Sequence, residues 1–226
     1  MDLLKFLLHL DDSLKSIIEN FGTLTYIILF MIVFAETGLV IIPFLPGDSL
    51  LFVVGTLAGG EYLNIWIAYF VLLTAAIIGD TVNYWIGSII GPRVFAKENS
   101  RFFKKEYLVK TSEFYAKYGG KTIILARFVP IVRTFAPFVA GVGKMDYKTF
   151  ITYNIVGGFL WVTILTFAGY FFGGLEIIKN NFEYAVIAII FVSIIPMLVE
   201  YIKHKRGPKE KLKDTSYEEI QKTFKK

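Results

Sequence analysis

The chain has 226 residues, of which 55% are hydrophobic and 19% charged. A soluble domain has about 45–50% apolar and 25% charged residues, and the mean hydropathy of +0.57 also lies on the apolar side. This composition excludes a disordered chain, a coiled coil and an ordinary soluble enzyme, and it favours an integral membrane protein. The chain has no cysteine, which excludes a disulfide framework and a thiolate metal site.

The formal charge of +5 is unevenly distributed along the chain. Residues 93–121 carry eight positive and three negative charges and residues 200–226 carry nine and five, whereas residues 22–92 carry none and four. Each basic block adjoins a long apolar stretch, as cytoplasmic loops of membrane proteins do. We therefore expect both blocks, including a basic tail at 203–226, in the cytoplasm. Because the basic residues flank apolar spans, we expect no nucleic-acid partner.

Residues 1–20 are expected to form an amphipathic helix that lies in the membrane interface. Leucine, isoleucine and phenylalanine recur at helical spacing on one face, while Asp11, Asp12, Lys15 and Glu19 interrupt the apolar run. The segment has no basic leader, so a cleaved signal peptide is not expected.

Long uncharged runs predict three spanning helices, at about 62–90, 149–173 and 184–202. A bilayer requires roughly 18 or more consecutive apolar residues, and Thr149–Leu175 provides 27 without a charge. The first helix ends in a basic block and therefore runs from outside to inside. The second must leave the cytoplasm, because the third returns to the basic tail.

Two further apolar regions, about 21–60 and 122–143, are too interrupted to be ordinary spans. Their helix-breaking residues are Pro43, Pro46, Gly47, Pro130, Pro137 and Gly141. Proline removes a helical hydrogen-bond donor, and backbone groups freed in hydrocarbon need protein or water as partners. The second region must also enter and leave on the same side, since both of its neighbours are cytoplasmic. These observations predict re-entrant helical hairpins.

The two interrupted regions resemble each other in sequence. Pro43-Phe-Leu-Pro-Gly matches Pro137-Phe-Val-Ala-Gly, and each is followed by a span of opposite direction. Paired broken segments of this kind indicate an inverted repeat with a binding site at the midplane. The predicted fold is thus an all-α polytopic membrane protein with three spans and two opposed re-entrant hairpins. The alternative is two Pro-kinked helices without symmetry.

The candidate site consists of charged residues within the apolar regions. They are Glu36, Asp48, Asp80, Arg127 and Arg133. Each costs at least about 2.5–3.5 kcal/mol in a bilayer unless it is paired or meets water. The guanidinium groups of Arg127 and Arg133 match a phosphate head group, while Glu36 and Asp48 would balance them and exchange protons. Structural ion pairing is the alternative, and Asp80 is either a secondary member or an interfacial cap.

Six motifs between about residues 20 and 200 resemble those of a known family. They are Phe34-Ala-Glu-Thr-Gly-Leu, Pro43-Phe-Leu-Pro-Gly-Asp-Ser-Leu-Leu, Gly79-Asp-Thr-Val-Asn-Tyr-Trp-Ile-Gly, Tyr118-Gly-Gly-Lys, Arg127-Phe-Val-Pro-Ile-Val-Arg-Thr-Phe-Ala-Pro-Phe-Val-Ala-Gly and Asn154-Ile-Val-Gly-Gly-Phe-Leu-Trp. The sequence resembles the bacterial DedA family, within the superfamily of SNARE-associated or VTT domains. The resemblance implies that residues 21–202 form one membrane domain in the bacterial cytoplasmic membrane, with a cytoplasmic C-terminus.

The resemblance also implies a function in lipid movement. Members are implicated in moving lipids between leaflets, notably undecaprenyl phosphate, and phosphatidylethanolamine in some cases. Others are linked to proton-dependent transport. The family's required acids and arginines fall on Glu36, Asp48, Arg127 and Arg133. We therefore expect a lipid translocase with lipids and protons as partners, and homo-oligomerisation is an open alternative.

Enzymatic function is not expected. The two histidines, His9 and His204, lie outside the apolar body, so a base for nucleophilic chemistry and ligands for a metal are both lacking. Gly119-Gly-Lys-Thr lacks the first glycine of a phosphate loop and is expected to be a turn. No cofactor is expected. The remaining alternatives are a general phospholipid scramblase and a proton-coupled exporter of small cations.

Overall fold

The computed structural model describes Ile18 and residues 20–39, 47–96, 105–173 and 175. Within these residues the structure is helical and contains no strand. The elements are α3 (Leu24–Gly38), α4 (Gly47–Gly59), α5 (Ile65–Ala96), α6 (Lys105–Tyr118), the short 3₁₀ helix η1 (Gly119–Lys121), α7 (Thr122–Ala126), α8 (Pro130–Val142) and α9 (Tyr147–Phe172). The all-α prediction is confirmed for this part of the chain.

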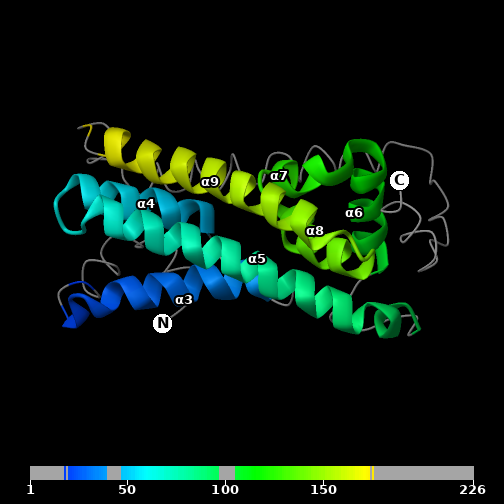
Figure 1. Cartoon of the computed structure of the whole chain (residues 1–226). Coiled ribbons are helices and arrows are strands. Elements are labelled where there is room, and N and C mark those ends of the chain that lie inside the picture. Colours follow the sequence, from blue (N-terminus) through cyan, green and yellow to red (C-terminus); the bar gives the residue numbers. More distant parts are fainter. Residues whose placement is uncertain (1–17, 19, 40–46, 97–104, 174, 176–226) are drawn as a thin grey trace.

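Helices α5 and α9 form the long axis of the molecule (Figure 1). Each contains an apolar stretch of 26 residues, Ile65–Ile90 and Tyr147–Phe172, that is long enough to cross a membrane. At 1.5 Å per residue such a stretch exceeds the roughly 30 Å of a hydrocarbon core. They correspond to the helices predicted at 62–90 and 149–173. The helix predicted at 184–202 lies outside the described residues, as do the tail and nearly all of residues 1–20.

The first interrupted region forms the helix pair α3 and α4, which starts and finishes at the same end of the molecule. Near the start of α3, the Tyr26 hydroxyl accepts a hydrogen bond from the backbone N–H of Asn64, five residues beyond α4, at 2.8 Å. At the opposite end of the pair, the N–H of Gly47 donates to Oε1 of Glu36 at 3.3 Å. The chain therefore runs along α3 from one end of the molecule toward its middle and returns to that end along α4. Pro43 and Pro46 lie outside the described residues.

The second interrupted region behaves in the same way. Helix α7 ends at Ala126, the backbone is extended at Val129, and α8 begins at Pro130, a position where a missing N–H costs nothing. The region also returns to its starting end, because a side chain at Gly120, just before α7, would touch Met145, just after α8. Gly119–Lys121 is the expected turn-like element, with Gly119 at a positive φ of 57°.

Pro137 does not shape this region as the sequence suggested. It lies inside α8, which continues to Val142. The break stands seven residues earlier, at the Pro130 end of the helix. Two carbonyls of α8 near Pro137 accept hydrogen bonds from side chains of neighbouring helices: Thr134 from Asn83 at 3.0 Å and Ala136 from Tyr115 at 2.8 Å.

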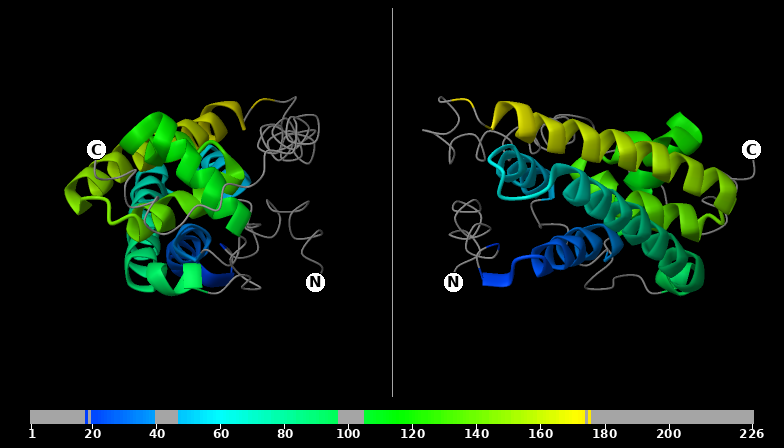
Figure 2. Two further views of the ribbon diagram at one scale, coloured as in Figure 1. Left: turned by 90° about the vertical axis from the view of Figure 1, so that its right-hand side faces the viewer. Right: turned by 60° about the vertical axis from the view of Figure 1, so that its left-hand side comes forward.

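Two helix crossings in the structure are built alike (Figures 1 and 2). Helix α4 packs on α9, and α8 packs on α5. At each crossing both helices contribute one glycine. Each glycine lies against a backbone carbonyl of the other helix, and that carbonyl belongs to the residue three positions before the other helix's glycine. The contacts are Gly55 on Thr166, Gly169 on Phe52, Gly141 on Tyr84 and Gly87 on Phe138. Glycine permits this close backbone approach between membrane helices.

These crossings change which residues of the first interrupted region correspond to which residues of the second. The sequence comparison aligned Gly47 with Gly141, but the crossings give Gly55 the role of Gly141, within Phe52-Val-Val-Gly and Phe138-Val-Ala-Gly. In both cases a helix of one half packs on the long helix of the other half. The matched crossings support the inverted-repeat-like arrangement, with a different pairing of residues.

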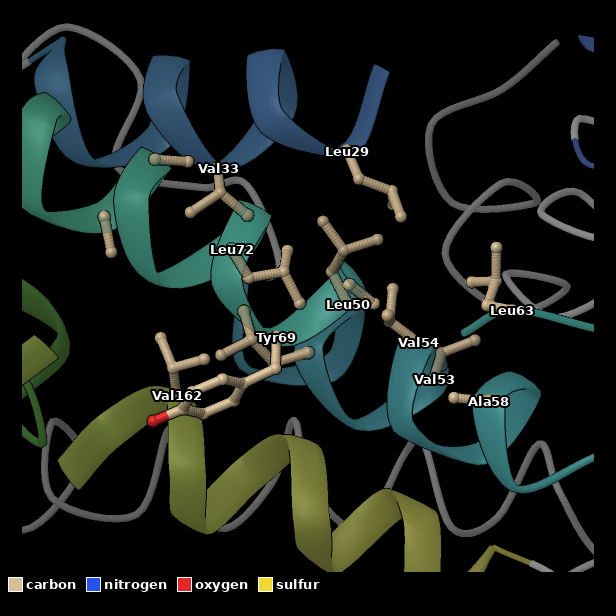
Figure 3. Packing of buried hydrophobic residues seen from close by; sticks show 14 of the residues in the cluster. Leu29, Val33, Leu50, Val53, Val54, Ala58, Leu63, Tyr69, Leu72 and Val162 are labelled. Carbon is tan, nitrogen blue, oxygen red and sulfur yellow. The ribbon is translucent and has the colours of Figure 1, made fainter. Parts of the chain in front are cut away.

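Buried apolar side chains form two clusters, one toward each end. The first joins α3, α4 and the facing halves of α5 and α9, and Figure 3 shows Leu50, Leu72 and Val162 from different helices converging in it. The second joins α5, α6, α7, α8 and the start of α9 around Phe138 and Phe150. The polar site described below lies between these clusters.

Candidate functional site

The charged side chains meet near the middle of the two long helices. Asp80 lies close to the centre of Ile65–Ile90 on α5, and Trp161 close to the centre of Tyr147–Phe172 on α9. The tips of both helix pairs reach this level: Glu36 is in the last turn of α3 and Asp48 in the first turn of α4. Arg133 comes from the first turn of α8.

Arg133 joins the tips of the two helix pairs. Its Nη1 donates to Oδ1 of Asp48 at 2.6 Å, and its Nη2 donates to Oε1 of Glu36. The predicted charge partners from the first region thus meet this arginine of the second region. The Arg133 side chain is 14% exposed, so part of its surface remains accessible.

Arg127 belongs to a second ion pair, which is sealed inside the bundle. Its Nη2 donates to Oδ2 of Asp80 and to Oδ1 of Asn154, each at 2.6 Å, and the side chain is only 2% exposed. The Arg127 side chain lies beside Gly157 and Gly158 of α9, and a side chain at Gly157 would crowd it. Asp80 is therefore a buried partner within α5 and does not cap its end.

The structure separates the predicted residues into two groups. Glu36, Asp48 and Arg133 form one cluster, and Asp80 and Arg127 form another. Among the shaping residues, Gly47 contacts the Glu36 carboxylate, and a side chain there would overlap it. The sequence did not predict which acid pairs with which arginine, because that choice depends on how the helices pack.

Three polar side chains that the sequence reasoning did not single out complete the site. Asn154 ties Arg127 to α5 by donating to the carbonyl of Ile77 at 3.0 Å. Asn83 donates to the carbonyls of Thr37 and Thr134 at 3.1 and 3.0 Å, and so joins the end of α3 to α8. The ring of Trp161 lies against the guanidinium groups of both arginines. All three stand in quoted motifs, and two are amides in apolar spans, a costly placement that signals a role.

The site has unused hydrogen-bonding capacity. Nε and Nη1 of Arg127 and Oε2 of Glu36 are buried and have no hydrogen-bond partner. Glu36, Asp48 and Asp80 together carry one more charge than the two arginines if all are ionised. A single proton would make the five charged residues neutral as a set. The described residues contain no group of three or more acids, histidines or cysteines that could hold a metal.

Within the described residues, two apolar helices of membrane-spanning length carry ion pairs buried near their centres, as is typical of a polytopic membrane protein. A family model for the VTT domain matches residues 45–171. With the relatives described next, this match shows that the chain belongs to the DedA family of VTT-domain membrane proteins.

Relatives cover most of the chain. Protein DedA of Escherichia coli (strain K12) is 53% identical over 207 residues, which cover 91% of this chain and 94% of that protein. The uncharacterized membrane protein Rv0364 of Mycobacterium tuberculosis (strain ATCC 25618 / H37Rv) is 47% identical over 79% of each chain. The inner membrane protein YqjA of E. coli K12 is 34% identical over 66% of this chain and 67% of its own. These names support a bacterial membrane location, and no solved structure matches.

Proposed function

We propose that this protein moves a phosphate-bearing lipid, most simply undecaprenyl phosphate, between the leaflets of the bacterial cytoplasmic membrane. The observation that carries the proposal is Arg133, a partly accessible guanidinium held near mid-membrane by carboxylates from the opposite helix pair. Both helix pairs are taken to be re-entrant, with their tips meeting at this level and the C-terminus in the cytoplasm. The function is transport, and no covalent step is proposed.

The head group would enter by exchange with a carboxylate. In the structure Arg133 is already bound to Glu36 and Asp48, so a phosphate oxygen must displace one of them. The displaced acid would then be left buried without its cation, which is costly. Taking up a proton removes that cost, and this links head-group binding to proton uptake.

Arg127 would supply the second contact to the phosphate. Its Nη2 is occupied by Asp80 and Asn154, but Nε and Nη1 have no hydrogen-bond partner. Guanidinium groups bind phosphate through paired N–H donors. The lipid tail would remain in the bilayer, beside exposed apolar residues of α5 and α9 such as Phe70, Ile89 and Phe159.

Reconstitution into vesicles tests this proposal. Wild-type protein should move undecaprenyl phosphate between leaflets, while Arg133→Gln and Arg127→Gln should each lower the rate at least about tenfold, the effect of losing a charged hydrogen bond. Lys148→Gln, at an exposed position at the start of α9, is the matched control and should leave the rate unchanged. Wild-type rates in both arginine variants would overturn the proposal.

The same vesicles separate the two rival functions. Equal movement of phosphatidylethanolamine, without competition from undecaprenyl phosphate, would indicate a general scramblase. Proton-coupled cation export that Glu36→Gln abolishes and the arginine variants leave intact would indicate an exporter. Either result would contradict a phosphate site built on Arg133.

A further inference from the structure

Trp161 links the two ion-pair clusters of the site. It lies on α9 and is only 1% exposed. The guanidinium carbons of Arg133 and Arg127 lie 5.1 and 5.6 Å from its ring centroid. Both distances fall within the range of about 6 Å in which a cation is attracted to an aromatic face. One ring therefore contacts both arginines, which come from different ion pairs.

The indole N–H of Trp161 makes a second connection. It donates to Oδ1 of Asp48 at 2.9 Å, and the same oxygen accepts the hydrogen bond from Nη1 of Arg133 at 2.6 Å. The side chain thus holds the carboxylate that neutralises Arg133 while its face lies against the guanidinium. A residue that only filled space in the core would not need this donor.

Helix α9 presents one face to both arginines. Asn154, Gly157 and Trp161 follow at helical spacing, so they lie on the same side of the helix. Asn154 accepts a hydrogen bond from Arg127, and Gly157 leaves room for the side chain of that arginine. The position of Arg127 relative to Arg133 is therefore set by α9, through Trp161 at the centre.

We propose that Trp161 is a positioning residue that fixes the two guanidinium groups relative to each other for binding one phosphate and holds Asp48 as the group exchanged for the phosphate. This inference rests on the proposed function and assigns the residue that gives its site a defined geometry. Its ligand class is a lipid phosphate, recognised by two arginines at once.

Transport kinetics test the positioning role. Trp161→Phe keeps an aromatic face but loses the N–H to Asp48, and Trp161→Leu loses both. We expect the half-saturating concentration of undecaprenyl phosphate to rise about tenfold in Trp161→Phe, as for loss of one charged hydrogen bond, and further in Trp161→Leu. The pH profile of the rate should shift in both. Trp66→Phe and Trp85→Phe, at side chains 59% and 50% exposed, are the controls and should behave as wild type.

A merely structural role would give a different result. The rate is therefore expressed per folded protein, determined by size-exclusion chromatography in detergent. Variants that yield less folded protein but keep the wild-type half-saturation and pH profile would overturn the inference. Wild-type values of the folded yield, the half-saturating concentration and the pH profile in both Trp161 variants would overturn it too.

Fluorescence provides a readout that does not depend on lipid transport. The chain has three tryptophans, so a Trp66→Phe/Trp85→Phe protein emits from Trp161 alone. Its emission should change when Asp48→Asn or Arg133→Gln is added, because these remove charges in contact with the indole. Emission insensitive to both would overturn the inference. Absence of lipid movement in wild-type vesicles, with emission sensitive to both, would contradict the proposed function and leave the position of Trp161 supported.

Discussion

Single residues divide the polar centre into a sealed part and an accessible part. Arg127 and Asp80 are almost fully enclosed, whereas Arg133 and Asp48 retain some exposure. Removing a charge from water costs several kcal/mol even in a real protein. Arg127 therefore depends on its partner for folding, while Arg133 can exchange partners.

The sealed pair gives the first prediction at this scale. Asp80→Asn leaves Arg127 buried beside a neutral amide and should lower the free energy of unfolding by about 3–5 kcal/mol, the cost of breaking a buried ion pair. The double variant Asp80→Asn/Arg127→Gln should be more stable than either single variant, because no charge is left unpaired. Thermal unfolding in detergent measures both effects.

The control for this prediction is Asp146→Asn. Asp146 caps α9 by accepting a hydrogen bond from the N–H of Thr149 at 3.0 Å, and it lies outside the apolar span. Asparagine caps helices about as well as aspartate, so the unfolding temperature of Asp146→Asn should stay near that of the wild type. Equal stability of Asp80→Asn and Asp146→Asn would show that the Arg127 pair does not behave as a buried pair.

At the scale of helices, the two glycine crossings determine how the halves fit together. Helix α4 of the first half lies on α9 of the second, and α8 of the second lies on α5 of the first. Glycine at each crossing brings the backbones close enough for the tips to meet. The separation of these helices therefore sets the distance between Arg133 and its carboxylates.

Adding one methyl group at a crossing tests this arrangement. In Gly55→Ala and Gly141→Ala the new Cβ would overlap a carbonyl oxygen of the facing helix, Thr166 or Tyr84. We expect each change to cost about 1–3 kcal/mol of stability, the usual penalty of overpacking. Gly60→Ala is the control, because its Cβ would meet the half-exposed Tyr62 ring at 3.2 Å, which can move, and the nearest backbone atom, the Leu57 carbonyl oxygen, is 3.6 Å away. Equal unfolding temperatures for all three variants would contradict the close approach.

Across the whole molecule, contacts at each end hold segments together that lie far apart along the chain. At one end Gly59 lies beside Tyr170 and Thr56 beside Gly173. At the other end the Tyr84 hydroxyl donates to the carbonyl of Met145 at 2.6 Å, and Gly120 packs next to Met145. The segment containing α7 and α8 thus begins and ends at the same end of the molecule.

Cysteine labelling tests this topology, since the natural chain has no cysteine. Lys121→Cys and Lys148→Cys, which flank α7 and α8, should react with a membrane-impermeant maleimide only from the cytoplasmic side. Tyr62→Cys and Leu175→Cys should react only from outside. The unsubstituted chain is the control and should not react. Labelling of Lys121→Cys and Lys148→Cys from opposite sides would mean that the α7–α8 pair crosses the membrane.

The sequence determined the parts of this protein that depend on local composition and spacing. Long uncharged runs predicted the helices α5 and α9, because hydrocarbon accepts apolar helices of sufficient length. Prolines and glycines marked the two interrupted regions. Charges in apolar surroundings identified Glu36, Asp48, Arg127 and Arg133 as the residues that need partners, because an unpaired charge there is too costly.

Only the tertiary structure decided how these parts combine. It paired Arg127 with Asp80 and Arg133 with the acids of the first helix pair, placed Trp161 against both arginines, and moved the internal correspondence from Gly47 to Gly55. The reason is physical. The amino-acid sequence shows that a charge in an apolar segment needs a partner. Which of several acids becomes that partner depends on which helices approach most closely. That approach is set by glycines whose contacts on the facing helix lie 51 to 117 residues away along the chain.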